Sequence, residues 1–176
     1  MELILSIELR KKSRQIKRVD SRQVGNRQIK KKEHSKGIKM ETTSTTGTLI
    51  HKIKHVEIFH DTFKIGNRYT PTAEVGENEY MLRYNLIKEE NEEYLEACKN
   101  GDLVEIADAL GDQLYILFGT ILRHGLQHKI EEVFDEIQRS NMSKLDENGQ
   151  PIFREDGKIM KSNLYFKPNI KTILEK

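Results

Sequence analysis

Apolar residues recur every three or four positions through much of residues 49–139, which is the spacing of amphipathic helices. The first such run, residues 49–65, has its apolar side chains at Ile53, Val56, Phe59 and Phe63. A loop follows it, marked by Gly66, Asn67 and Pro71. The pattern therefore predicts a first helix and then a loop before residue 77.

A second helix is predicted over residues 77–99, because the Asn100-Gly101 pair after it favours a helix C-terminus. Asp102, with Glu105 three positions later, has the form of a capping box. This box predicts the start of a third helix, which continues to about residue 123. Only a few residues separate the two helices.

A fourth helix is predicted over residues 128–139. Beyond it, Asn148-Gly149 and Asp156-Gly157 are turn signals that flank short apolar runs, consistent with a small hairpin. Residues 169–176 fit a short closing helix. Together these elements predict an all-α, four-helix domain over residues 49–176, with a C-terminal loop and hairpin region.

Charge divides the chain into two unlike parts. Residues 1–39 hold 13 Lys or Arg and 4 Asp or Glu, although the whole chain carries a net charge of only +2. Such a segment has few apolar side chains to bury, so residues 1–48 are expected to be a disordered basic tail and linker. Two alternatives are an arm that binds nucleic acid and a translation start at Met40.

The single cysteine, Cys98, excludes an intrachain disulfide framework. No apolar run approaches the roughly 20 residues that a membrane-spanning helix needs. The short apolar patch near the N-terminus lacks the order of a secretory signal. These features together favour a cytoplasmic protein.

Acidic residues of the second helix lie where a core-facing stripe is expected. At about 100° per residue, Glu89, Glu90 and Glu93 share an arc with apolar residues such as Leu86. Glu92 projects to the opposite side, as a solvated residue would, and Glu96 borders the acidic arc. Carboxylates are rarely buried unless a cation neutralises them.

The third helix is apolar nearly all round, a pattern typical of a central buried helix. Its acids, Glu105, Asp108 and Asp112, fall on one strip. If the second and third helices pack antiparallel, the two acidic strips meet, and their repulsion is tolerable only around cations. Because the donors are oxygens, without His, Cys or Met, the pattern predicts Mg²⁺, with Mn²⁺ as a second possibility.

At these residues the chain resembles the MazG-like all-α nucleoside triphosphate pyrophosphohydrolases. The motifs "EENEE" and "EIAD" resemble the acidic signature of that superfamily. The loop "SNMSKLDENGQPIFREDGKIMKSNLYFKP" resembles the branch of the bacterial MazG-like dUTP diphosphatase. The resemblance covers roughly residues 56–168. It implies hydrolysis of a nucleoside triphosphate between the α and β phosphates.

The resemblance also implies roles for the acids. Glu89 and Glu90 are the expected catalytic residues, with Glu89 orienting or deprotonating the attacking water. The expected metal ligands are Glu89, Glu90, Glu93, Glu105, Asp108 and Asp112. Only 11 residues separate Glu93 from Glu105, a short spacing for the superfamily. The second metal pair is therefore Glu105 with Asp108 as the first choice, or Asp108 with Asp112 one turn later.

Cations and aromatic rings are expected to hold the phosphates and the base. The candidate substrate-binding residues are Arg83, Asn141, Lys144, Lys158, Lys161, Phe63 and Tyr115. Phe59 is expected in the core instead. His55 and His60 have no ligand partner at a useful spacing, so both are expected at the surface or at a pocket edge.

The resemblance implies a pyrimidine deoxynucleotide such as dUTP as the substrate. Phosphoribosyl-ATP and dCTP are the alternatives on the same scaffold. The rival of another class is a non-catalytic helical protein whose basic tail binds nucleic acid. The resemblance also implies a homodimer or tetramer, which would cover a helix that so small a unit leaves exposed.

Overall fold

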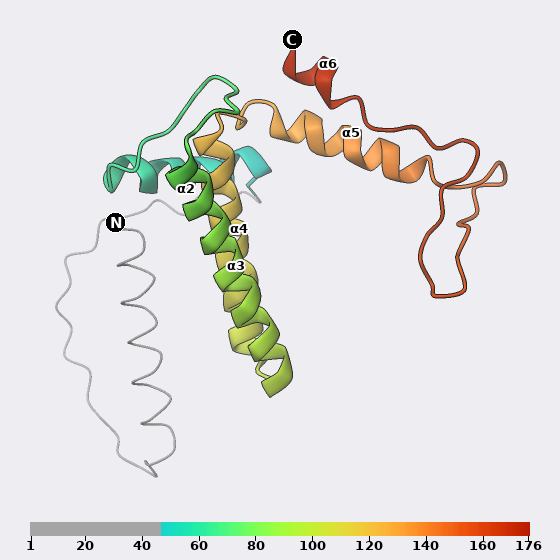
Figure 1. Ribbon diagram of the computed structural model, residues 1–176, viewed down its shortest axis with the longest axis horizontal. Coiled ribbons are helices and arrows are strands. Elements are labelled where there is room, and N and C mark those ends of the chain that lie inside the picture. Colours follow the sequence, from blue (N-terminus) through green and yellow to red (C-terminus); the bar gives the residue numbers. More distant parts are fainter. Residues whose placement is uncertain (1–46) are drawn as a thin grey trace. The chain divides into compact units, whose positions relative to one another are not determined.

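The computed structural model describes residues 47–176, which fall within one compact unit (Figure 1). This part is helical, without a strand, and has one isolated antiparallel bridge, Phe153 with Ile159. Its helices are α2 (Leu49–Thr62), α3 (Glu77–Asn100), α4 (Leu103–Arg123), α5 (Ile130–Met142) and α6 (Ile170–Leu174). The all-α prediction is therefore confirmed. The predictions for the basic tail and for Met40 lie outside the described residues.

Helices α3 and α4 form a long antiparallel hairpin (Figure 1). Gly101 ends α3 in the left-handed conformation, with φ of 65°, and its backbone N–H bonds to the carbonyls of Ala97 and Cys98. Asp102 then caps α4, because its carboxylate accepts from the backbone N–H groups of Val104 and Glu105. The predicted stop and start signals are both confirmed.

Helix α2 packs on α4 and completes the small core. Ile53 and Val56 of α2 lie against Ile121 and Leu122 of α4, and all four side chains are buried. The first helix was predicted to residue 65, but α2 ends at Thr62 because the chain turns into the following loop. None of the helices in residues 47–176 is both long and apolar enough to span a membrane.

A half-buried ion network ties the loop after α2 to the hairpin. Glu79 of α3 accepts two hydrogen bonds from the Arg68 guanidinium, at 2.9 and 3.2 Å. It accepts two more from Arg123, at 2.5 and 2.7 Å. The Arg123 hydrogen bond, with that of Arg68, lowers the pKa of Glu79 to about 2, although burial acts in the opposite direction. This network anchors the loop.

The expectation of a centrally buried α4 is wrong for the single chain. Leu110, Leu114 and Leu117 of α4 are 44%, 54% and 45% exposed. Neighbouring α3 also exposes Tyr84 and Leu95. In the described part of the chain, α3 and α2 make most of the helix contacts with α4, and part of its circumference meets solvent.

The C-terminal segment is built on α5, which spans Ile130–Met142 rather than the predicted 128–139. The chain returns along α5 because Ser140 donates from its hydroxyl to the Phe166 carbonyl at 2.8 Å. The predicted hairpin is present as the Phe153–Ile159 bridge, and α6 is the predicted closing helix.

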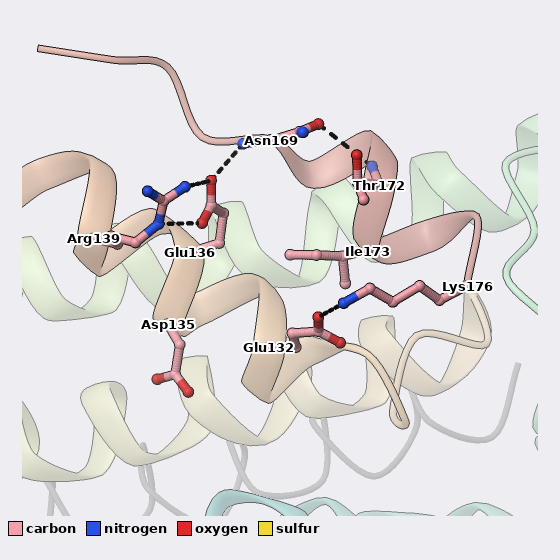
Figure 2. Close-up of a pocket in the computed structure, with 8 residues that line it drawn as sticks. All are labelled: Glu132, Asp135, Glu136, Arg139, Asn169, Thr172, Ile173 and Lys176. Atoms are coloured by element: carbon pink, nitrogen blue, oxygen red, sulfur yellow. Dashed lines mark hydrogen bonds and ion pairs between the residues drawn. The ribbon is translucent and has the colours of Figure 1, made fainter.

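A shallow groove lies between α5 and α6, and Figure 2 shows how its side chains pair across it. Glu136 accepts from Arg139 and from the Asn169 backbone N–H, and Lys176 donates to Glu132. The groove is therefore the seam that holds the C-terminus on α5.

Candidate functional site

Hydrogen bonds fix the register of α3 against α4. The Gln113 amide donates to the Glu90 carbonyl at 3.3 Å, and Arg83 donates to the Ile116 carbonyl at 2.7 Å. Each helix rises 1.5 Å per residue. In this register Asp112, the neighbour of Gln113, lies level with Glu90.

The same register places the remaining acids along the hairpin. Asp108, about one turn before Asp112, lies close to the level of Glu93. Glu105 lies one turn nearer the hairpin turn, at the level of Ala97. Whether Glu105 with Asp108 or Asp108 with Asp112 forms the second acidic pair stays a prediction.

Glu90 lies on the buried face of α3, as the helical projection predicts. Its side chain is 2% exposed, on the same face as Arg83, Leu86 and Ala97. Glu89, Glu93, Glu105 and Asp112 are half-buried, and Asp108 is exposed. A carboxylate in so apolar a stripe is costly to ionise unless a cation or hydrogen bonds stabilise it.

The metal prediction concerns these carboxylates. Among residues 47–176, the His, Cys, Asp and Glu side chains do not form a group of three or more that could hold a metal ion as they stand. The roles of the acids as ligands therefore stay predictions. The donor set itself fits Mg²⁺, because carboxylates occupy the matching levels of both helices and no His or Cys lies among them.

An aromatic cluster lies close to the acidic strip along the chain. The Phe59 ring centroid is 4.4 Å from that of Phe63 and 5.5 Å from that of Tyr115, which meets it edge to face. Tyr115 follows Asp112 by three positions on α4, about one helical turn. Two of the predicted base-binding residues, Phe63 and Tyr115, are thus brought together through Phe59.

The predicted phosphate-binding side chains of the C-terminal segment contact other residues of that segment. Lys144 donates to the Asn141 side chain at 2.8 Å, so these two lie together. Lys161 Nζ lies 4.4 Å from the centroid of the Tyr165 ring. Lys158 lies in the small C-terminal hairpin that follows α5. The contacts that these lysines make in the described residues are thus local to the C-terminal segment.

The prediction for His60 is wrong, because its side chain is only 2% exposed. The loop after α2 folds back over it, and Asn67 shares a 2.9 Å hydrogen bond with its Nδ1. Burial lowers the pKa of His60, and the nearby Arg83 and Arg123 lower it further, whereas the Asn67 contact raises it. His55 is exposed, as expected.

Arg83 lies in the interior and not on the surface. It is 5% exposed, and its Nε donates to the Thr120 hydroxyl at 3.0 Å. Burial, with Arg123 nearby, lowers the pKa of Arg83 to about 10. The sequence reasoning missed the partners of Arg83; the signal for them was Gly119, a glycine inside an otherwise apolar helix.

The all-α hairpin, with its acidic residues on both helices, fits the resemblance to nucleotide pyrophosphohydrolases. Residues 56–141 match the sequence model of the family described as phosphoribosyl-ATP pyrophosphohydrolase, which belongs to the MazG-like all-α superfamily. The matched segment begins in α2, contains the whole α3–α4 hairpin and ends in α5. No curated protein matches the chain.

The family match covers the acidic signature of the superfamily but not most of the loop that resembles the dUTP diphosphatases. It covers every acidic residue of the predicted site, from Glu89 to Asp112. It ends at residue 141, the second residue of the segment 140–168 on which the resemblance to dUTP diphosphatases rests. The pyrophosphohydrolase class is thus supported, and the dUTP branch is left to experiment.

Proposed function

We propose that this protein hydrolyses a nucleotide between its α and β phosphates, releasing pyrophosphate and a monophosphate, with Mg²⁺ as cofactor. The observation that carries the proposal is that the segment similar to the phosphoribosyl-ATP pyrophosphohydrolases contains both acidic strips, and that the register puts Asp112 level with Glu90. Such a hairpin can hold a hard cation and, through it, a polyphosphate.

The acids have two roles in the proposed reaction, metal binding and proton acceptance. Glu90, Glu93, Asp108 and Asp112 would hold Mg²⁺, which when bound neutralises the phosphates and makes a water molecule more acidic. Glu89, half-buried at the edge of this set, orients that water and accepts its proton. The water oxygen bonds to phosphorus as the anhydride bond breaks, and pyrophosphate leaves.

Two substrates are proposed in order. A pyrimidine deoxynucleotide such as dUTP is the first, on the resemblance of the C-terminal loop; Phe63 and Tyr115 would stack on its base, and Asn141, Lys144, Lys158 and Lys161 would reach its phosphates. Phosphoribosyl-ATP is the second, on the family match. Both reactions break the same type of bond, so the acidic strips serve either substrate.

We also propose that the chain self-associates through the hairpin. Leu110, Leu114 and Leu117 recur at helical spacing on α4 and are 44–54% exposed, more apolar surface on one helix face than an isolated domain usually leaves in water. A second copy would cover this stripe. Leu114→Glu is expected to lower the mass measured by light scattering to that of one chain, whereas an unchanged mass would refute this.

The test of the activity is pyrophosphate release from dUTP, dCTP and phosphoribosyl-ATP by the full 176-residue chain with Mg²⁺. Glu90→Gln is expected to lower kcat by at least about 100-fold with the helical content retained. Glu92→Gln is the matched control, because Glu92 is 67% exposed on the opposite side of α3. It is expected to behave as the wild type.

Two outcomes would contradict the proposal. The first is no pyrophosphate from any of these nucleotides with either Mg²⁺ or Mn²⁺. The second is full turnover by Glu90→Gln. If the protein instead bound nucleic acid with an affinity that falls steeply with salt, the alternative of a non-catalytic, nucleic-acid-binding protein would replace the proposed enzyme.

A further inference from the structure

Among the described residues, the buried Arg83 guanidinium has no acidic partner in an ion pair, which is rare for an arginine. Its side chain is 5% exposed, and no carboxylate of residues 47–176 forms an ion pair with it. The nearby Glu79 is already bonded to Arg68 and Arg123. The buried charge of Arg83 therefore serves something other than a salt bridge.

Instead, the Arg83 guanidinium holds α4 at two points one turn apart. Its Nη2 donates to the Ile116 carbonyl at 2.7 Å, and its Nε donates to the Thr120 hydroxyl at 3.0 Å. That hydroxyl itself donates to the same Ile116 carbonyl at 2.9 Å. The three groups form a closed triangle of hydrogen bonds between the two helices.

Gly119 makes room for this contact. A Cβ atom at that position would lie 2.6 Å from Arg83 Nη2 and 3.0 Å from His60 Nε2. Any side chain there would have to displace the guanidinium or the imidazole. The glycine thus lets Arg83 reach the α4 backbone.

Arg83 lies two helical turns before Glu90 on the same buried face, and Ile116 lies one turn after Asp112. A slip of α4 against α3 by one residue would move Asp112 by about 1.5 Å relative to Glu90, enough to spoil a ligand set. We propose that Arg83, Gly119 and Thr120 form a register clamp that sets the levels of the acidic strips. Arg83 is thus a positioning residue and not a phosphate ligand.

The kinetic test of this inference, pyrophosphate release, rests on the proposed function, whereas the Mn²⁺-binding test does not. The experiment measures Mn²⁺ binding to the full chain by electron paramagnetic resonance, with thermal unfolding and pyrophosphate release alongside. Arg83→Lys keeps the charge but lacks the planar fork that bridges two acceptors. Thr120→Val removes the hydroxyl of the triangle.

Both variants are expected to weaken Mn²⁺ binding about tenfold and to lower kcat, with the nucleotide KM unchanged. Lys88→Met is the control for charge, because Lys88 is a 57% exposed cation on α3 beside the acids. It is expected to change Mn²⁺ binding less than twofold. Arg83→Met should match Arg83→Lys if geometry rather than charge is decisive.

Several results would overturn the clamp. Arg83→Lys with wild-type Mn²⁺ affinity would mean that only the charge acts. A raised nucleotide KM with unchanged Mn²⁺ affinity would mean that Arg83 contacts substrate. A lower unfolding temperature alone would mean a purely structural role, and a wild type that binds no Mn²⁺ would also refute the clamp. If the Mn²⁺ pattern holds but no nucleotide is hydrolysed, the clamp stands and the proposed function fails.

Discussion

Replacing Glu79 with glutamine tests the ion network that anchors the loop to the hairpin. Glu79→Gln keeps the shape of the side chain but leaves Arg68 and Arg123 without the carboxylate that receives four hydrogen bonds. The fall in the pKa of Glu79 from 4.5 to about 2 corresponds to about 3 kcal/mol. Since 18% of the side chain is exposed, solvent screening reduces this, and we expect the free energy of unfolding to fall by about 2 kcal/mol at pH 7.

The lowered pKa of Glu79 determines how the stability difference between wild type and Glu79→Gln changes with pH. The pKa of Glu79 is lower in the folded state, so its contribution is fully present above pH 4.5 and is lost as the pH falls through about 2. The gap between wild type and Glu79→Gln should therefore shrink to about 1 kcal/mol near pH 3. Urea unfolding followed by far-ultraviolet circular dichroism, at several pH values and one protein concentration, measures it.

Glu74→Gln is the matched control, because Glu74 is an exposed acid of the same loop and its loss changes the net charge equally. It is expected to leave the free energy of unfolding nearly unchanged. Equal losses for the two variants would refute the reasoning. So would a Glu79→Gln deficit that does not diminish between pH 7 and pH 3.

Three further changes follow from the described contacts. Gly125→Ala should destabilise the fold by more than about 2 kcal/mol, as seen in chemical unfolding, because its Cβ would lie 2.1 Å from the Thr70 carbonyl oxygen at a φ of +67°. Asp102→Ala should cost about 1 kcal/mol by removing the cap of α4, whereas Asp102→Asn should cost less. The pKa of His60 is lowered by burial, so the wild type should lose stability as the pH falls below about 6.5, and His60→Gln should flatten that slope in the same assay.

Local signals made the helices predictable. Gly101 and Asp102 act through contacts with residues no more than five positions away, so their effect can be predicted from the sequence. The burial of Glu90 was also predictable, because helical periodicity relates it to Leu86 and Ala97.

What could not be predicted depends on which elements cover each face. His60 is buried by a loop that returns over it, and no periodicity encodes that return. Leu110 and Leu114 look like core residues by composition, yet the described chain supplies nothing to cover them. Arg83 shares a face with Glu90, but its bond to the Ile116 carbonyl arises from the tertiary register. The burial of Glu90 was therefore predictable, whereas the tertiary contacts of His60 and Arg83 were not.

The tight turn at Gly101 and Asp102 has a consequence for how the chain folds. The acids from Glu89 to Asp112 fall within 24 consecutive residues, and the turn brings their two halves together with little loop closure. Contacts between residues close in sequence form on the microsecond-to-millisecond scale. The hairpin should thus zip outward from its turn and assemble the acidic strips early, and α2 and α5 would then dock on a site that already exists.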